Sequence, residues 1–172
     1  METVKRLLAL DERLSRGLRI AEKPGLLRTV AAVLAHSGDS WFWLLGLLLL
    51  WLLGDVYWKE IVLILAGGIL VTAVLVLVVK FSIRRQRPAG EWGGMYRRTD
   101  PHSFPSGHAA RAFLLAMLAF GLGLGWISLL LLIWAPLVSL ARVAMGVHYL
   151  SDVLAGMVVG VVMGSIILAV IG

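Results

Sequence analysis

The sequence predicts an all-α protein, a polytopic bundle of transmembrane helices preceded by an amphipathic helix. Hydrophobic residues make up 60% of the 172 residues and charged residues 15%, against roughly 45–50% and about 25% in soluble domains. The mean hydropathy is +0.92. Residues 61–79 contain no charged side chain, and a stretch of about 20 such residues spans a bilayer as a helix. We therefore expect a single membrane-embedded domain over residues 1–172.

Residues 1–23 predict an amphipathic helix that lies in the membrane interface. Its arginines fall largely on one side, and its apolar residues fall roughly on the other: Val4, Leu7, Leu8, Leu14 and Leu18. Such a helix usually anchors a protein to the bilayer surface, and a lipid-recognition role is the alternative. Asp11 interrupts the apolar face, and Pro24-Gly25 ends the helix.

Five apolar segments predict transmembrane helices. They lie near residues 38–54, 59–80, 106–122, 126–145 and 151–171. The first is short for a bilayer, and a sixth crossing requires residues 24–37 to enter the membrane. Glycine recurs every fourth residue in the last segment, at Gly156, Gly160 and Gly164. This spacing predicts close packing against another helix.

The polar residues at the ends of the spans can be assigned to membrane faces, because successive spans alternate in direction. The second span ends at the face where a long basic loop leads into the third, and the fourth span ends at this face again. Seven polar residues therefore meet there: Lys80, Arg87, Ser106, His108, Arg142, His148 and Asp152. We expect a functional site at this face.

Several of these residues suit the binding of a phosphate group. Lys80, Arg87 and Arg142 are cations that local acids do not easily neutralise, which favours an anion of high charge density. Ser106 and Gly107 begin a helix, where free backbone N–H groups and the helix dipole bind anions.

Two histidines beside this cradle indicate nucleophilic and acid–base chemistry. His108 and His148 can each act as nucleophile or general acid near neutral pH. Asp152 follows His148 by four residues, so both side chains lie on one side of a helix entry, where the carboxylate can fix the imidazole tautomer. The sequence has no cysteine and no carboxylate cluster, so we expect neither a metal nor a cofactor.

Each residue also has a purely structural explanation when taken alone. Lys80 can be a snorkelling anchor, Ser106 a helix cap, His148 an interfacial histidine and Asp152 an N-cap. Their convergence at one face is what favours a site, because ionisable residues near the ends of membrane helices are usually functional.

The other polar residues are given structural roles. The remaining loop arginines are interpreted as orientation charges: Arg84, Arg85, Arg97 and Arg98. Residues 36–40 are interpreted as a turn in which His36 and Asp39 cap a helix or face solvent, and a role for the two as site residues is the alternative. Arg111 has no catalytic role in this interpretation; it lines the cleft or pairs with Asp100 or Glu91.

Three motifs in residues 80–152 resemble those of the type 2 phosphatidic acid phosphatase superfamily of integral membrane lipid phosphatases. They are Lys-x6-Arg-Pro, Pro-Ser-Gly-His and Ser-Arg-x5-His-x3-Asp. The sequence supplies them as Lys80, Arg87 and Pro88, then Pro105 to His108, and finally Arg142, His148 and Asp152. Ala141 stands where the third motif has Ser, which removes one hydroxyl expected near the phosphate.

The resemblance implies a role for each motif residue. His148 is the expected nucleophile, which forms a phosphohistidine, and Asp152 orients it. His108 protonates the leaving oxygen and then activates water. The phosphoryl oxygens are held by Lys80, Arg87, Ser106, Gly107 and Arg142.

The expected function is therefore hydrolysis of a lipid phosphomonoester or diphosphate, without a metal and without nucleic acid. The candidate substrates, in order, are undecaprenyl diphosphate, phosphatidylglycerol phosphate and phosphatidic acid. Lipid A phosphatases and glucose-6-phosphatases share the motifs and are further alternatives. A vanadium-haloperoxidase-like enzyme shares the cradle, but such enzymes are soluble. A non-catalytic protein that binds anionic lipids is the third alternative.

The charge count and the family resemblance place the site on opposite faces of the membrane. The count of Lys and Arg places the site in the cytoplasm, although some of these charges serve phosphate. The resemblance favours the outer face of a bacterial inner membrane, which we take as the expectation.

Overall fold

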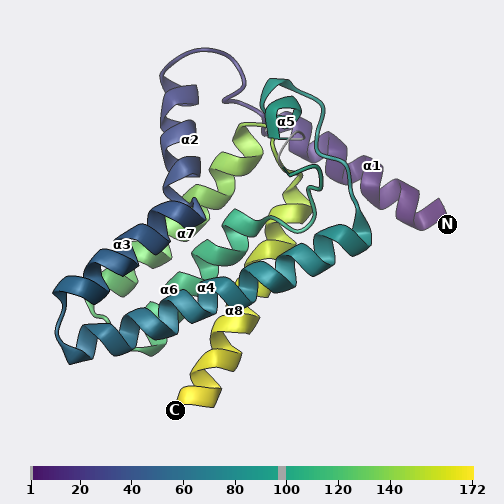
Figure 1. Cartoon of the computed structure of the whole chain (residues 1–172). Helices are drawn as coiled ribbons and strands as arrows, with labels where there is room; N and C mark the ends of the chain where they lie inside the picture. The colour runs from purple at the N-terminus through teal and green to yellow at the C-terminus, as the bar shows by residue number, and fades with distance from the viewer. Residues whose placement is uncertain (1, 97–99) are drawn as a thin grey trace.

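The computed structural model describes residues 2–96 and 100–172, and helices dominate this part of the chain (Figure 1). The helices are α1 (Glu2–Gly17), α2 (Leu26–Ser37), α3 (Ser40–Leu53), α4 (Val56–Ile83), α5 (Glu91–Tyr96), α6 (Gly107–Gly121), α7 (Trp126–Ala144) and α8 (Leu150–Ile171). Extended pairing within the described ranges is confined to one isolated bridge between Gln86 and His102. The predicted all-α architecture is confirmed.

The number of helices able to cross a membrane is smaller than the sequence predicts. α4, α7 and α8 are long and apolar enough, and α2 and α3 qualify together as one span bent by 53°. α6 has 15 residues, and at 1.5 Å per residue it is about 22 Å long, short of a hydrocarbon core of about 30 Å. The described residues thus hold three to four candidate spans, and the five predicted spans are not confirmed.

The bend between α2 and α3 changes the interpretation of residues 24–37. α2 has 12 residues, about 18 Å of helix, which cannot cross a bilayer alone. It is joined to α3 by Gly38 and Asp39, so the two helices form a broken span or a re-entrant loop.

α1 is the amphipathic helix that the sequence predicts, and it ends at Gly17. Its apolar face is exposed to the surroundings: Leu7, Leu8, Leu10 and Leu14 are each about half exposed or more. Asp11, which interrupts this face, accepts a hydrogen bond of 3.0 Å from the backbone N–H of Ser151 at the start of α8. Ser15 Oγ accepts another, of 2.8 Å, from the N–H of Leu150. The polar interruption therefore fixes α1 to the bundle.

The centre of the bundle is the contact between α6 and α8, in which the predicted glycine stripe faces α6. A Cβ atom added to Gly156 would lie 2.4 Å from the carbonyl oxygen of Ser106, and one added to Gly160 would lie 2.3 Å from that of Ala110. The packing role of the stripe is confirmed: glycine is required because backbone, rather than a side chain, occupies the opposing position.

We predict that Gly160→Ala destabilises the fold, because the new methyl group meets the backbone of α6. Overpacking of this kind typically costs about 1–3 kcal/mol. Gly67→Ala in α4 is the matched control, since nothing lies within 4 Å of a Cβ at that position. Thermal unfolding in detergent measures both, and equal melting temperatures for the two variants would contradict the prediction.

Candidate active site

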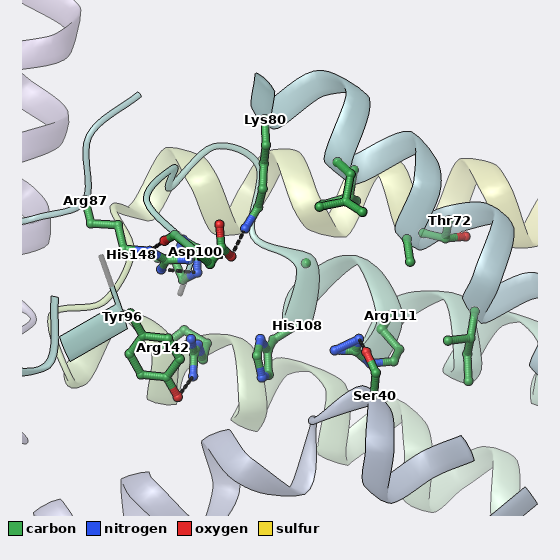
Figure 2. A pocket seen from close by; sticks show the side chains of 15 residues that line it. Ser40, Thr72, Lys80, Arg87, Tyr96, Asp100, His108, Arg111, Arg142 and His148 are labelled. Atoms are coloured by element: carbon green, nitrogen blue, oxygen red, sulfur yellow. Dashed lines mark hydrogen bonds and ion pairs between the residues drawn. The ribbon is translucent and has the colours of Figure 1, made fainter. Parts of the chain in front are cut away.

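One cavity of about 320 Å³ lies between α4, α6 and the end of α7 (Figure 2). Six of the eight predicted site residues line it: Lys80, Arg87, Gly107, His108, Arg142 and His148. Its other polar lining residues are Ser40, Thr72, Tyr96, Asp100 and Arg111. The predicted site residues thus meet largely in one cavity, whose lining includes two histidines and four cations.

Two of the cations are neutralised by a carboxylate that the sequence did not single out for this role. Asp100 forms an ion pair with Lys80 through its Oδ2, and the same oxygen lies 2.7 Å from Arg87 Nη2. Arg87 Nε also donates to the backbone carbonyl of Asp100 at 2.6 Å. The expectation that local acids leave Lys80 and Arg87 unneutralised is wrong. Burial alone would raise the pKa of Asp100, but these two cations hold it below its ordinary value.

Arg142 remains without a carboxylate partner in the described part of the chain. It is 1% exposed, its Nη1 donates to the Tyr96 hydroxyl at 3.2 Å, and its guanidinium lies 4.6 Å from the centre of the Tyr96 ring. Its Nε is buried without a hydrogen-bond partner. This cation is therefore available to an anion in the cavity.

His148 is held in one neutral form by its neighbours. Arg87 Nη1 lies 3.1 Å from His148 Nε2, and because a guanidinium can only donate, Nε2 must carry the lone pair. The proton is then on Nδ1, which lies 3.5 Å from Asp152 Oδ2. Burial, followed by the charges of Arg87, Arg142 and Lys80, keeps the pKa of His148 well below its ordinary value. The imidazole is thus neutral at pH 7, with its lone pair directed at the cation cluster.

Asp152 lies behind His148, outside the cavity lining, and is fully buried. Its Oδ2 accepts from the backbone N–H of Tyr149 at 2.9 Å, and its Oδ1 accepts from Arg85 Nη1 at 2.7 Å. The distance to His148 is longer than either, and His148 Nδ1 makes no hydrogen bond among the described residues, so Asp152 lies beside the imidazole but does not hydrogen-bond it here.

Arg85 binds the carboxylate of Asp152 behind the cavity, a role that the sequence did not indicate. Besides Asp152, it binds Asp11 of α1 at 2.7 Å, and its guanidinium lies 3.9 Å from the centre of the Tyr149 ring. It was interpreted as an orientation charge, but it links α1 to the carboxylate behind His148. Its position in a run of basic residues gave no signal of this role. Arg84 next to it ends α4 and is exposed, while Arg97 and Arg98 lie outside the described residues.

His108 has a carboxylate partner that sequence reasoning also missed. Asp39 Oδ1 lies 2.7 Å from His108 Nε2, and Asp39 Oδ2 lies 3.1 Å from His36 Nδ1. Asp39 makes no side-chain cap on α3, so its interpretation as a capping or solvated residue is wrong. The available signal was an acidic residue between two apolar segments, because an ionisable group at membrane depth usually has a specific partner.

Comparison with known proteins agrees with this geometry. Residues 61–172 match the PAP2 superfamily.

The chain belongs to the PAP2 superfamily.

The relatives of the chain within this family are phosphatases. Decaprenylphosphoryl-5-phosphoribose phosphatase of Mycobacterium tuberculosis is 32% identical over 155 residues, covering 86% of this chain and 82% of the relative. The crystal structure of LpxE from Aquifex aeolicus has a TM-score of 0.71 at 30% identity, covering 91% of this chain and 93% of that one. A PAP2-type phosphatidylglycerolphosphate phosphatase of Bacillus subtilis shares the fold, with a TM-score of 0.78 at 23% identity over 96% of this chain and 86% of its own. The protein is therefore an integral membrane hydrolase of phosphoric monoesters.

Besides Asp152, the serine of the second motif and the position of the serine in the third lie outside the cavity lining. Ser106 is fully buried, and its hydroxyl accepts a hydrogen bond from the N–H of Ala109, so it caps α6. Ala141, where the motif has Ser, belongs to a buried apolar cluster that also includes Ala31 and Ala35 of α2. The expectation that this departure removes a hydroxyl beside the phosphate is therefore not supported, because position 141 does not line the cavity.

Arg111 lines the cavity but pairs with neither of the acids proposed for it. Asp100 binds Lys80 and Arg87, and Glu91 binds Arg28 at 2.8 Å. Arg111 instead donates to the carbonyl of Gly38 at 3.0 Å and to the hydroxyl of Ser40. No group of three His, Asp or Glu residues able to hold a metal occurs among the described residues.

We predict that nitrogen-15 NMR finds His148 as the neutral Nδ1–H tautomer at pH 7. Because its pKa is lowered, it should take up a proton only below pH 6.5, the ordinary value for histidine. The resonance is assigned by its loss in His148→Ala. A protonated His148 at pH 7, or the Nε2–H tautomer, would contradict the arrangement of Arg87 and Asp152 described above.

Proposed function

We propose that the protein hydrolyses a membrane lipid phosphate or diphosphate by way of a phosphohistidine at His148. The observation that carries this proposal is the lone pair of a neutral, buried imidazole directed at buried cations, with a second histidine across the same cavity. Such an arrangement provides both a nucleophile and electrostatic stabilisation of the charge that develops on the phosphoryl oxygens.

In the first step, His148 Nε2 attacks phosphorus, and the bond between phosphorus and the leaving oxygen breaks. Arg87 gives up its contact with Nε2 and binds phosphoryl oxygens together with Lys80 and Arg142. His108 supplies the proton that the leaving lipid oxygen takes up. The Nδ1 proton of His148 faces Asp152, so the positive charge gained by the imidazole is stabilised by a carboxylate.

In the second step, water replaces the imidazole on phosphorus. His108, now unprotonated, accepts the proton of the attacking water, and the N–P bond to His148 breaks to release inorganic phosphate. Asp39 stabilises the protonated form of His108 in both steps, because it accepts a hydrogen bond from Nε2. Asp39 is a positioning residue in this proposal, since it acts through His108.

A lipid substrate suits the walls of the cavity. Ile69, Val76 and Leu77 of α4 line its apolar side next to the cations, so a charged head group and an apolar chain can be bound together. The relatives whose names include decaprenylphosphoryl phosphoribose and lipid phosphate support this class. The candidates remain undecaprenyl diphosphate, phosphatidylglycerol phosphate and phosphatidic acid.

The proposed location is the bacterial inner membrane, with the site at the outer face. α8 starts beside the site and extends away from it (Figure 1), so a reporter fused after Gly172 lies at the opposite face. We expect cytoplasmic activity from that reporter, and periplasmic activity would place the site in the cytoplasm.

We predict that His148→Ala abolishes phosphate release from lipid phosphates, by about 10³-fold or more, because the nucleophile is lost. The assay is run with a chelator present, and wild-type activity should survive chelation. A His108→Ala variant incubated with labelled substrate should retain phosphate on His148. Full activity in His148→Ala would exclude this residue as the nucleophile, and absence of phosphatase activity in the wild type would favour a lipid-binding protein.

We predict that Asp39→Asn slows hydrolysis about 10²-fold for alkyl phosphates but much less for an aryl phosphate with a good leaving group. The reason is that only the alkyl oxygen needs a strong general acid. His36→Gln is the matched control, because His36 contacts the same carboxylate and is half exposed. An equal loss on both substrates would assign Asp39 a structural role instead.

A further inference from the structure

We propose that Arg111 and Ser40 form a second anion-binding subsite, which holds a phosphate in the leaving group of the substrate. This inference rests on the proposed function and narrows it. The preferred substrate then carries a second phosphate on the lipid side of the bond that breaks. A simple lipid monophosphate lacks this group.

The first argument is the position of Arg111 in the cavity. It lies one turn after His108 on α6, and in Figure 2 His108 separates Arg111 and Ser40 from Arg142 and His148. His148 and Arg142 belong to the end where the phosphoryl group is transferred. Because His108 protonates the leaving oxygen, the rest of the leaving group extends past His108 toward Arg111.

The second argument is the charge of Arg111. Its side chain is 8% exposed, and no carboxylate of the described residues lies within ion-pair distance of it. Asp39 is near enough for its charge to act on Arg111, but its two oxygens are bound by His108 and His36. Among the described residues, the hydrogen bonds of Arg111 go to neutral groups, the Gly38 carbonyl and the Ser40 hydroxyl. A buried guanidinium without an anionic partner is costly unless a ligand supplies the charge.

The third argument is an unused hydroxyl in the same cavity. Thr72 of α4 lines it and is 2% exposed, and its Oγ1 has no hydrogen-bond partner among the described residues. Buried polar atoms in proteins are normally satisfied. A phosphate between α4 and α6 could accept a hydrogen bond from Thr72 and two from Arg111.

The geometry therefore points to a phosphate ester as leaving group. It can be the adjoining phosphate of a polyprenyl diphosphate, or a phosphodiester further along the head group. Both sources offer the same chemistry, an anion with oxygens that accept from a planar guanidinium. Inorganic phosphate bound beside His148 and Arg142 would make no contact with Arg111.

The test compares matched substrates in one detergent. The first pair is a polyprenyl diphosphate and the monophosphate of the same chain, and the second is phosphatidylglycerol phosphate and phosphatidic acid of the same acyl chains. We expect the wild type to favour one doubly phosphorylated member by at least about 10-fold in kcat/KM. The preferred pair identifies whether the subsite takes an adjoining phosphate or a distant phosphodiester.

Arg111→Gln should remove this preference, with a loss of at least about 10-fold on the doubly phosphorylated substrate and less than about 3-fold on its monophosphate. Arg111→Lys should restore part of it, and Arg84→Gln is the control at an exposed arginine. Equal losses on both members of a pair, or no preference in the wild type, would overturn the subsite while leaving the phosphatase intact. No release from any of the four substrates would instead overturn the proposed function. If Arg111→Gln does not fold, the wild-type preference alone decides.

Discussion

The site depends on one close contact, the approach of the α6 backbone to α8. Gly156 and Gly160 let the carbonyl oxygens of Ser106 and Ala110 lie where any side chain would stand. The backbone N–H of Ser106 donates to the carbonyl of Asp152 at 2.9 Å, which joins the starts of the two helices. His108 follows Ser106, and His148 precedes Asp152, so this contact fixes the relative positions of the two backbone segments that carry the imidazoles. The spacing of these segments is therefore set by main-chain contacts, which cannot relax by changing rotamer.

A second constraint is the imbalance of charge around the cavity. Four cations line it, and Asp100 is the one acidic residue among the described lining residues. Its side chain is 40% exposed, while Lys80 and Arg87 are almost fully buried. Because Asp100 is partly exposed, a phosphoryl group that enters the cavity can replace it as the anionic partner of Lys80 and Arg87. The two cations then keep an anionic partner throughout the exchange. Asp100 thus offsets part of the cost of burying Lys80 and Arg87 side by side.

The sequence predicted the site residues that lie close together along the chain. It did not predict the contacts between residues that are far apart in the sequence. His148 and Asp152 are four residues apart, and the remaining motif residues follow from the alternation of spans. By contrast, Asp39 reaches His108 across 69 positions, and Arg85 reaches Asp152 across 67. The five predicted spans are not confirmed for a physical reason, since apolar composition alone does not distinguish a long crossing helix from the short α6 or from the bent pair α2 and α3. The close packing of α8 was predictable because glycine has few other reasons to recur every fourth residue.

The break between α2 and α3 has a consequence for how the protein can change. The two residues of the break and Ser40, the first residue of α3, each bind a side chain of the cavity: Gly38 and Ser40 bind Arg111, and Asp39 binds His108. The turn therefore joins two parts of the cavity, because Asp39 holds an imidazole while its two neighbours hold a guanidinium. A shift of this short segment would move His108 and Arg111 together, so the positions of these two side chains are coupled.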